Sequence, residues 1–377
     1  NGNLVNAHAV RRELEGRGAI FGTTSDSEVV LHLLARSREH SLEERLIDAL
    51  SRVKGAFSLV LLTEDALIAV RDPNGFRPLT LGRVDGSWVV ASETCALDLI
   101  GAEVERDLDP GEVVVIRRGR LRSLRPFPKS DRETFCIFEY IYFARPDSNL
   151  PGGNVYAFRK DLGRVLAREH PVEADMVVPL LDSGSPAALG FAEESGIPFE
   201  TAIIRNHFVG RTFIEPTQSI RDFGVQIKHN AVHGILDGKR VVLVDDSIVR
   251  GTTLLKISGM IRNAGAREVH VRISAPPTIG SCHYGIDMPT RSELIAYRLS
   301  VEEICESIGA DSLGYLSLEG LRIVSRQLKH GHCDACFSVD YPVRIDSQHP
   351  APQLSLFSSV VEQDDGETEQ DEREREA

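Results

Sequence analysis

The stretch Arg240-Val-Val-Leu-Val-Asp245-Asp246-Ser247-Ile-Val-Arg250-Gly251-Thr252-Thr253 decides the fold of the second half of this chain. Four consecutive apolar residues, 241–244, predict a strand that is buried on both faces. Two carboxylates end this strand, at the edge where α/β sheets place their ligands. A loop of small and hydroxyl residues then opens into a helical pattern, and the first N–H groups of a helix suit an anion. Together these features predict a ribose-phosphate site.

Strands and helices alternate on both sides of this motif. A strand at 175–180 ends in Leu181-Asp182-Ser183-Gly184-Ser185-Pro186 and is followed by a helix at 187–195. Further strands are predicted at 199–204 and 268–274. Repeated strand, loop and helix units favour a mostly parallel sheet with helices on both faces.

The first half has a different pattern. Helices are predicted at 6–16, 28–37 and 42–53, followed by strands at 56–62, 66–70, 88–92 and 112–116 that turn residues separate. This indicates an α+β region with antiparallel strands. The pattern of predicted elements changes near Arg125-Pro-Phe-Pro128, so we predict domains at 1–125 and 126–345. Residues 346–377 are predicted to be an acidic, disordered tail.

Composition excludes several classes of protein. The 377 residues carry a net charge of −13, and nine acids and two arginines lie between Glu362 and Ala377. An acidic body argues against non-specific nucleic-acid binding. No apolar run approaches the roughly 18 residues of a membrane span. Six cysteines without secretory features indicate a reducing, cytoplasmic location, with thiols or metal ligands rather than disulfides.

The opening motif resembles the phosphoribosylpyrophosphate (PRPP) signature of type I phosphoribosyltransferases. This resemblance implies Mg²⁺ ligands at Asp245 and Asp246, with Ser183 as a third. It also implies a 5′-phosphate loop, whose residues in this sequence are Ser247, Arg250, Gly251, Thr252 and Thr253. The structural alternatives are two acids that cap the next helix and a turn serine that caps the helix after Pro186.

The first half carries an ordered set of modest motifs, namely Asn1-Gly2-Asn3-Leu4, Thr24-Ser25-Asp26-Ser27-Glu28, Arg71-Asp72-Pro73-Asn74-Gly75-Phe76-Arg77-Pro78-Leu79 and Ala91-Ser92-Glu93. In this order they resemble the glutaminase domain of N-terminal-nucleophile amidotransferases. Over residues 1–345 the chain resembles glutamine PRPP amidotransferases. That family implies an oxyanion hole at Asn1 and Gly2 and a glutamine-binding role for Asp26. Taken singly, Asn1-Gly2 is typical of a turn and Asp26 of a helix cap.

Two departures from the family pattern stand out. The family nucleophile is a cysteine at the mature N-terminus, whereas residue 1 here is Asn and the first cysteine is Cys95. We therefore expect an N-terminally incomplete family member that uses ammonia and not glutamine. The second departure lies in Asn206–Ile214, which resembles the loop that closes over PRPP but has His207-Phe208 where the family has Arg-Tyr. Arg205 and Arg211 remain nearby.

Four of the six cysteines occur in contexts similar to those of an iron–sulfur subgroup of this family. They are Cys136, Cys282, Cys333 and Cys336. The resemblance implies a [4Fe–4S] cluster, whereas ligand chemistry alone also permits structural Zn²⁺ or unligated thiols. Cys95 and Cys305 are interpreted as small core residues.

The resemblance implies the first committed step of de novo purine biosynthesis, in which PRPP and glutamine-derived ammonia give 5-phosphoribosylamine and pyrophosphate. It also implies inhibition by purine nucleotides and a dimer or tetramer of identical subunits. Two alternatives are a non-catalytic, nucleotide-binding regulator on the same fold and a salvage phosphoribosyltransferase that acts on a nucleobase.

Overall fold

A computed structural model describes residues 1–128, 130, 133–206, 229–328 and 330–345. Asn1–Ile345 form one compact unit. The tail at 346–377 and residues 207–214 of the loop expected to close over a substrate lie outside the described residues. None of the described helices is both long enough and apolar enough to cross a lipid bilayer.

The first half combines antiparallel sheets with helices. Its helices are α1 (Ala7–Glu15), α2 (Glu28–Arg36), α3 (Leu42–Ser51) and α4 (Thr94–Leu99). Its strands are β1 (Gly2–Leu4), β2 (Gly55–Leu62), β3 (Ala66–Arg71), β4 (Thr80–Val84), β5 (Ser87–Ala91), β6 (Glu103–Asp107), β7 (Val113–Arg117) and β8 (Arg120–Leu124). The described strands form one sheet in the order β1-β2-β3-β7-β8 and a second in the order β5-β4-β6.

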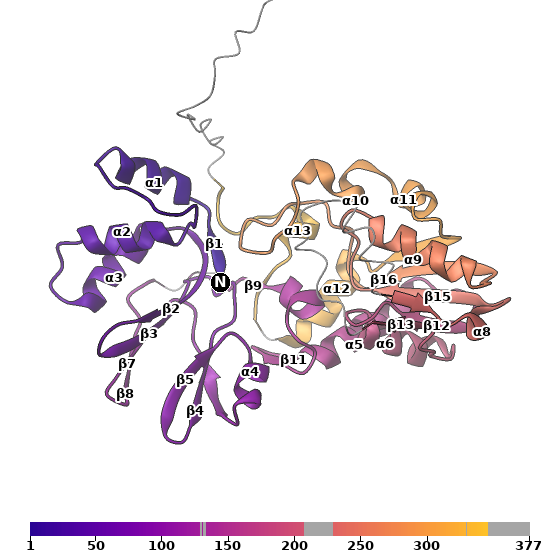
Figure 1. Cartoon of the computed structure of the whole chain (residues 1–377), viewed down its shortest axis with the longest axis horizontal. Helices are drawn as coiled ribbons and strands as arrows, with labels where there is room; N and C mark the ends of the chain where they lie inside the picture. The colour runs from indigo at the N-terminus through magenta and orange to yellow at the C-terminus, as the bar shows by residue number, and fades with distance from the viewer. Residues whose placement is uncertain (129, 131–132, 207–228, 329, 346–377) are drawn as a thin grey trace, which may run out of the picture. The chain divides into compact units, whose positions relative to one another are not determined.

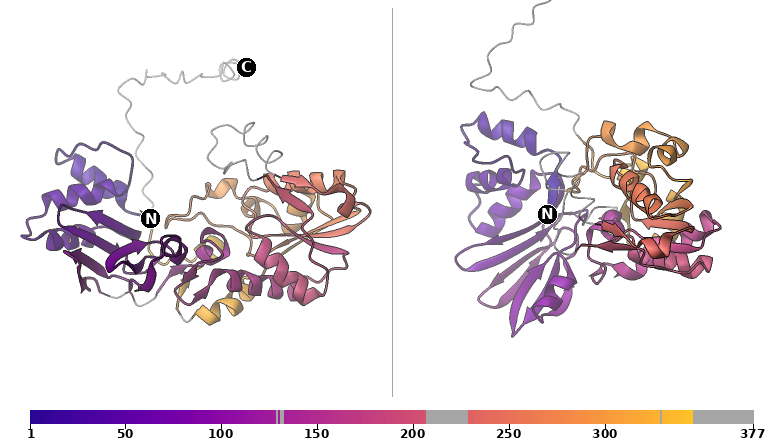
Figure 2. Two further views of the ribbon diagram at one scale, coloured as in Figure 1. Left: turned by 60° about the horizontal axis from the view of Figure 1, so that its bottom comes forward. Right: turned by 45° about the vertical axis from the view of Figure 1, so that its right-hand side comes forward.

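Alternating side chains on β3 separate two apolar cores. Ile68 and Val70 face a cluster that includes residues of α1, α2 and α3, so the helices cover one face of the larger sheet. Ala69, between them, faces a cluster that contains Leu81 and Trp88 from the smaller sheet. The period of two along the strand thus produces a helix layer and two sheet layers (Figures 1 and 2).

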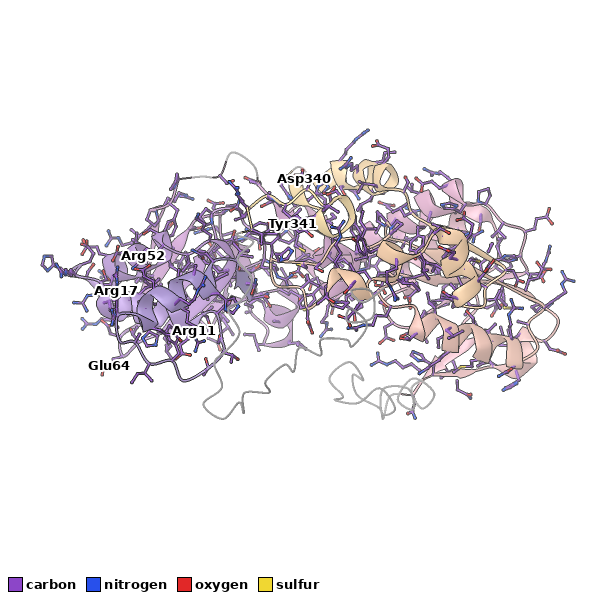
Figure 3. The ribbon with its side chains drawn as sticks, turned by 90° about the horizontal axis from the view of Figure 1, so that it is seen from above. Arg11, Arg17, Arg52, Glu64, Asp340 and Tyr341 are labelled. Atoms are coloured by element: carbon purple, nitrogen blue, oxygen red, sulfur yellow. The ribbon has the colours of Figure 1, made fainter. Side chains whose placement is uncertain are left out.

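Ion pairs connect α1 to the residue that ends α3. Glu13 of α1 lies 3.0 Å from Arg17, which follows the end of this helix, and 2.7 Å from Arg52. Arg11 places its guanidinium carbon 4.2 Å from the centre of the Phe21 ring. Figure 3 labels these three arginines, which surround the helices at the protein surface. Each exposed ion pair of this kind contributes little to the stability of the folded protein.

The second half alternates strands and helices. Its helices are η1 (Glu139–Phe143, a π-helix), α5 (Val155–Glu169), α6 (Ser185–Ser195), α8 (His233–Leu236), α9 (Thr252–Asn263), η3 (Arg291–Glu293), α10 (Ile295–Arg298), α11 (Val301–Ser307), α12 (Leu318–Ser325), η4 (Arg326–Leu328) and α13 (Ala335–Ser338). Its strands are β9 (Phe135–Cys136), β10 (Asn149–Leu150), β11 (Gly153–Asn154), β12 (Met176–Pro179), β13 (Ile203–Arg205), β14 (His229–Ala231), β15 (Arg240–Asp245), β16 (Glu268–Ile273), β17 (Ser312–Tyr315) and β18 (His332–Cys333).

The expected parallel sheet is present. Its described strands run in the order β12-β15-β16-β17, and each neighbouring pair is parallel. Val242 and Val244 pack into a core with α5, α6 and α12, whereas Val241 and Leu243 pack into a core with α9 and α11. Helices therefore cover both faces, and β15 is buried on both sides as its apolar run predicts (Figure 1).

The predicted strand at 199–204 is largely wrong. Phe199 makes a single parallel bridge to Val177, and regular pairing begins only at β13, which is antiparallel to β14 and outside the main sheet. The apolar run at 202–204 indicated burial, and Ala202 and Ile203 are indeed fully buried, but burial alone does not specify pairing.

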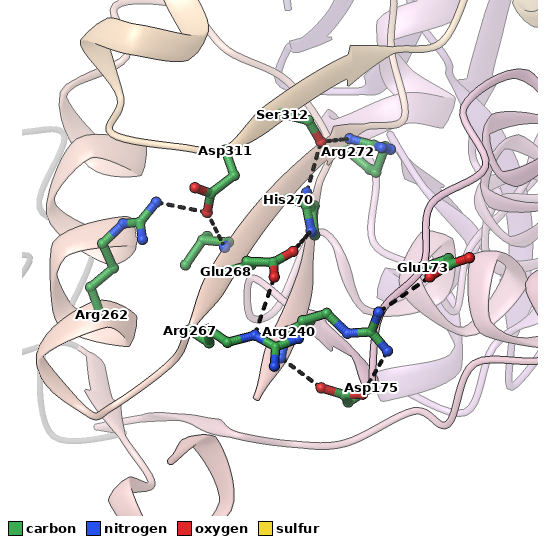
Figure 4. Close-up of polar contacts among 11 residues, drawn as sticks. Glu173, Asp175, Arg240, Arg262, Arg267, Glu268, His270, Arg272, Asp311 and Ser312 are labelled. Atoms are coloured by element: carbon green, nitrogen blue, oxygen red, sulfur yellow. Dashed lines mark hydrogen bonds and ion pairs between the residues drawn. The ribbon is translucent and has the colours of Figure 1, made fainter. Parts of the chain in front are cut away.

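A polar network fastens the start of the parallel sheet, at the edge opposite the carboxylates. The Arg240 side chain donates to Asp175, and Asp311 accepts from Arg262 and from the Val269 N–H (Figure 4). Nδ1 of His270 lies 2.9 Å from the Ser312 hydroxyl. These bonds join neighbouring strands where regular pairing begins.

Helices α5 and α6 approach so closely that glycine is required in their contact. A Cβ on Gly163 would lie 1.9 Å from the carbonyl oxygen of Ala187, and one on Gly190 would lie 1.9 Å from that of Lys160. The two backbones therefore touch without intervening side chains. Since α6 follows the loop that contains Ser183, this contact also positions that loop.

We predict that Gly190→Ala destabilises the protein by roughly 1–3 kcal/mol, because the added methyl group overpacks the helix contact. Gly259→Ala is the matched control, since Gly259 lies within α9 and a Cβ on it would point into open space, with no neighbour within 4 Å. This control is expected to gain about 0.5–1 kcal/mol from helix propensity. Urea unfolding of both variants measures the difference. Equal midpoints would contradict the close packing.

Candidate active site

Asp245 and Asp246 lie side by side at the carboxyl end of β15, where both are almost fully buried. The Asp246 N–H donates to Oδ1 of Asp245 at 2.8 Å, and the Ser247 hydroxyl donates to Oδ2 of Asp246 at 2.6 Å. Burial raises the pKa of Asp245 well above its ordinary value, and the neighbouring Asp246 adds to this rise. Two carboxylates at this spacing call for a compensating cation.

The loop after β12 lies against this acidic pair. A Cβ on Gly184 would lie 2.5 Å from the carbonyl oxygen of Val244 and 3.2 Å from Cα of Asp245, so only glycine fits here. Ser183, the preceding residue, is thereby brought to the end of β15. The peptide bond between Leu181 and Asp182 is cis. The loop that contains Ser183 therefore lies beside the acidic pair.

The loop after β15 feeds the N-terminus of α9, as expected. Gly251 has a φ of +79° and precedes Thr252, the first residue of the helix. A Cβ on Gly251 would lie 2.8 Å from the Ile295 side chain, and the Ile295 N–H donates to the Val249 carbonyl at 2.9 Å. The hydroxyl residues of the loop thus stand at a helix N-terminus, which attracts anions.

Arg250 is engaged with another residue in this structure. Its guanidinium lies 2.9 Å from the Glu293 carboxylate, and this contact is the largest cause of the lowered pKa of Glu293. Both side chains are about half exposed, at 53% and 47%. An exposed pair of this kind is weak, so Arg250 can exchange Glu293 for a phosphate at small cost.

Gly2 presents its N–H away from the sheet. Asn1 exchanges hydrogen bonds in both directions with Ser58, and Gly2 pairs with Phe57 at the next position along the ladder. In an antiparallel pair that next position is not hydrogen-bonded, so the Gly2 N–H points away from β2. A backbone N–H that points away from the neighbouring strand, at the edge of a sheet, suits an oxyanion.

Asp26 is not the cap of α2. Ser27 occupies the N-cap position without a side-chain capping bond, and the Asp26 carboxylate instead accepts the Leu4 N–H at 2.7 Å. Leu4 is two residues after Gly2, so both N–H groups point to the same side of β1. The structure therefore places Asp26 on the side to which the Gly2 N–H points.

The Arg71–Leu79 motif forms a buried scaffold. Asp72 is fully buried and accepts N–H bonds from Phe57, Asn74 and Phe76. Burial raises the pKa of Asp72 to about 6. The adjacent Arg71 guanidinium donates to backbone carbonyl groups, including that of Arg77. These two side chains hold the turn together.

Two acids that sequence reasoning did not select connect the halves of the chain. Glu93 accepts the Arg145 N–H and the Ser148 hydroxyl. Glu139 lies 3.0 Å from Arg77, and both side chains are buried. The one indication of the Glu93 contacts in the sequence was the position of Glu93 in the Ala91-Ser92-Glu93 motif.

Arg159 occupies the junction between these contacts and the acidic pair. It is 2% exposed and donates to the carbonyl oxygens of Tyr140 and Ala144 at 2.7 Å. Burial lowers the pKa of Arg159 to about 10, and the charge of Asp246 is the largest opposing influence. Its guanidinium therefore fixes the π-helix.

Four cysteines from distant parts of the chain line one cavity. They are Cys136, Cys282, Cys333 and Cys336, and Phe76, Tyr284 and Tyr341 are among the other lining residues. Cys333 pairs with Cys136 in the β18–β9 ladder. Burial raises the pKa of Cys336 well above its ordinary value, and the other three thiols add to the rise. The four cysteines predicted to act together therefore line the same space.

Neither of the remaining cysteines lines the cavity. Cys95 is buried as expected, whereas Cys305 is only partly buried, so its interpretation as a core residue is half right. Among the residues that the structure describes, no three Cys, His, Asp or Glu side chains converge in an arrangement ready for a metal ion. The four thiols surround a space and do not meet at one point.

Comparisons with known proteins identify both halves. Residues 1–99 match the family model of a glutamine amidotransferase domain, and residues 160–278 match that of a phosphoribosyl transferase domain. A chloroplastic amidophosphoribosyltransferase of Vigna aconitifolia is 52% identical over 363 residues, or 96% of this chain and 74% of the relative. An amidophosphoribosyltransferase of Bacillus subtilis is 50% identical over 94% of this chain and 75% of its own length.

A solved structure gives the same match. It is described as glutamine PRPP amidotransferase from B. subtilis complexed with ADP and GMP, and it shares 49% sequence identity with this chain. The TM-score is 0.85, and the match covers 92% of this chain and 77% of that structure. The chain spans only 61% of a chloroplastic relative from Arabidopsis thaliana, to which it is 54% identical.

The buried Glu139 predicts a specific pH dependence of stability. Burial raises the pKa of Glu139 from 4.5 to about 7, so between these values the folded protein holds a proton that the unfolded chain releases. The stability associated with the neutral side chain is complete below pH 4.5 and is lost as the pH rises to about 7. Glu139→Gln is expected to remove this loss, of the order of 3 kcal/mol.

Urea unfolding between pH 5 and 8 provides the test. Glu139→Gln should match the wild type near pH 5 and become progressively more stable than the wild type at higher pH. Glu306→Gln, an exposed position on α11, should follow the wild type throughout. Parallel curves for Glu139→Gln and the wild type would show that Glu139 titrates normally.

Proposed function

The chain belongs to the amidophosphoribosyltransferase family of purine biosynthesis, and on that premise we propose that its second half transfers the phosphoribosyl group of PRPP to ammonia. The products are 5-phosphoribosylamine and pyrophosphate. One observation carries the proposal: the buried pair Asp245–Asp246 ends a parallel strand, and the next loop opens into the N-terminus of α9.

The oxygens of Asp245, Asp246 and Ser183 fit Mg²⁺, because this ion prefers hard oxygen ligands and keeps much of its shell as water and substrate phosphate. Mg²⁺ would neutralise the charge of the pyrophosphate group. The two buried carboxylates supply the negative charge that offsets the cation, and Gly184 keeps the Ser183 loop beside them.

The loop at 247–253 would hold the 5′-phosphate through its N–H groups and hydroxyls. Arg250 would leave Glu293 for the phosphate. In the transfer, a bond forms between ammonia nitrogen and ribose C1, and the C1–oxygen bond to pyrophosphate breaks. The leaving oxygen keeps the electron pair, and the new amine loses a proton to solvent. Positioning and charge stabilisation account for the catalysis.

In the first half, the Gly2 N–H would stabilise the oxyanion of amide hydrolysis, with Asn1 as its side-chain partner. Asp26 would bind the α-amino group of glutamine. The support is geometric, since the Asp26 carboxylate lies on the side of β1 to which this N–H points. The transfer step on ammonia does not depend on these residues.

The four cavity cysteines would bind a [4Fe–4S] cluster. Such a cluster has four iron corners, and thiols that surround a space fit it better than they fit a single Zn²⁺. Its role would be structural, because Cys333 and Cys336 lie in the C-terminal segment and Cys136 lies next to the π-helix. The cluster would cross-link these segments, and oxidation of the cluster would break the cross-links.

The remaining assignments concern regulation, assembly and location. Purine nucleotides would inhibit the chain, since the B. subtilis structure is described as a complex with ADP and GMP. The chain would form a homodimer or homotetramer and act in the cytoplasm, although the Vigna relative is described as chloroplastic. A non-catalytic regulator would share the PRPP site but release no pyrophosphate.

We predict Mg²⁺-dependent release of pyrophosphate when the protein is given PRPP and ammonium chloride. The rate should rise with pH, because free ammonia and not the ammonium ion is the nucleophile. Asp245→Asn and Asp246→Asn should each lower kcat by about 100-fold or more. Asp98→Asn is the matched control, at an exposed position of α4, and should retain the full rate.

Substrate controls separate the alternatives. PRPP binding measured by calorimetry, without turnover, would favour the regulator. Pyrophosphate release that depends on an added nucleobase and not on ammonium would favour the salvage enzyme. Either result in folded protein would contradict the proposed transfer to ammonia.

Anaerobic addition of equal amounts of ferrous and ferric iron, together with sulfide, should produce a broad visible absorbance with four iron atoms per chain. Cys136→Ser and Cys333→Ser should lose most of this absorbance, because each removes one thiolate from the cavity. Cys95→Ser and Cys305→Ser should retain it, since neither residue lines the cavity. Binding of one Zn²⁺ with no absorbance would instead favour the zinc alternative.

A further inference from the structure

The loop that carries Cys282, residues 282–286, lies directly against the strand that carries Gly2. A Cβ on Gly285 would lie 2.6 Å from both Cα and the carbonyl carbon of Gly2. The Asn3 side-chain amide donates to the His283 carbonyl at 2.9 Å. Gly285 has a φ of +104°. Backbone therefore touches backbone, between segments at opposite ends of the described chain.

Gly2 is confined from its other side as well. A Cβ on Gly2 would lie 2.1 Å from the carbonyl oxygen of Ala56 on β2. The Gly2 peptide is thus held between Ala56 and Gly285, and a shift of either neighbour moves it. Ala56 also belongs to the apolar cluster that contains Tyr284 and Cys333. Both neighbours of Gly2 are thereby connected to the cysteine cavity.

The sulfur of Cys282 holds the loop in place. It accepts the Tyr284 N–H at 3.3 Å and the Ile286 N–H at 3.4 Å, and these two residues flank Gly285. A sulfur that carries a metal is a thiolate and accepts such bonds more strongly than a thiol does. The position of Gly285 therefore depends on the state of the Cys282 sulfur.

The Tyr284 side chain fixes the remainder of the loop. Its ring stacks on Phe76 with centroids 4.3 Å apart, and its hydroxyl donates to the Val343 carbonyl at 2.8 Å. Phe76 in turn accepts the Cys136 N–H on its carbonyl oxygen at 2.9 Å. A second cysteine of the cavity is thus tied to the same stack, so the loop and the cavity wall move together.

We propose that Gly285 is a positioning residue that couples the four-cysteine cavity to the Gly2 amide. When the cavity holds its cluster, the loop is drawn onto Cys282 and presses the Gly2 peptide into the orientation in which its N–H faces Asp26. When the cavity is empty of metal, the loop relaxes and β1 loosens. This inference rests on the proposed cluster and on the proposed oxyanion role of Gly2.

Hydrogen–deuterium exchange of the peptide spanning residues 1–6, read by mass spectrometry, tests the coupling in the full chain. Protein reconstituted with equal amounts of ferrous and ferric iron, together with sulfide, is compared with metal-free protein. We expect exchange in β1 to be about tenfold slower after reconstitution, because loading suppresses local opening. In Gly285→Ala this difference should disappear, while the cluster absorbance remains.

Gly309→Ala is the matched control. Gly309 also has a positive φ, +67°, but a Cβ on it would have no neighbour within 4 Å. The Gly309→Ala variant carries the same kind of backbone penalty without touching β1. Exchange of residues 1–6 in this variant should therefore match that of the wild type. Asn3→Ala, which removes only the bond to His283, should show part of the Gly285→Ala effect and does not depend on that variant folding.

The outcomes are distinguishable. A wild type that gains the cluster absorbance without slower exchange in β1 would overturn the coupling. Absence of absorbance would reject the proposed cluster. In that case, exchange in the metal-free variants tests whether the Gly285 contact holds β1. Faster exchange of residues 1–6 in Gly285→Ala but not in Gly309→Ala would support this contact. Equal exchange rates in the two variants would overturn it.

Discussion

The acidic pair at the end of β15 is the constraint around which the second half is arranged. Two ionised carboxylates can remain together out of water only when a cation or fixed dipoles compensate them, and otherwise one of them takes up a proton. The fold supplies three such features: the N-terminus of α9, the Arg159 guanidinium and the Ser183 loop held close by Gly184. The glycine contact between α5 and α6 also supports the acidic pair, because it positions the Ser183 loop.

Much of this arrangement could be predicted from the sequence. The apolar run before Asp245 specified a buried parallel strand, and the glycine and threonines after it specified a helix N-terminus. Local patterns such as these report burial and chain direction well. They failed for residues 199–204, where burial does not come with regular pairing in the main sheet. The assignment of individual ligands came from family resemblance and not from spacing.

Contacts between distant segments could not be predicted in this way. Nothing adjacent to Glu139 in the sequence shows that Arg77 lies against it, or that Arg159 anchors the π-helix that begins with it. The same holds for Gly285, whose lack of a side chain matters only because Gly2 lies against it. Each contact joins segments that meet only in the folded chain, so a single sequence carries no periodic signal for it.

The position of the metal ion provides the most direct test of the proposed transfer site. Anomalous diffraction from crystals grown with Mn²⁺ and PRPP would locate the ion without reference to activity. We expect one Mn²⁺ at about 2.2 Å from oxygens of Asp245 or Asp246 and of PRPP, with Ser183 in the same coordination shell and the 5′-phosphate at residues 247–253. An ion bound elsewhere, or PRPP bound away from β15, would contradict this site.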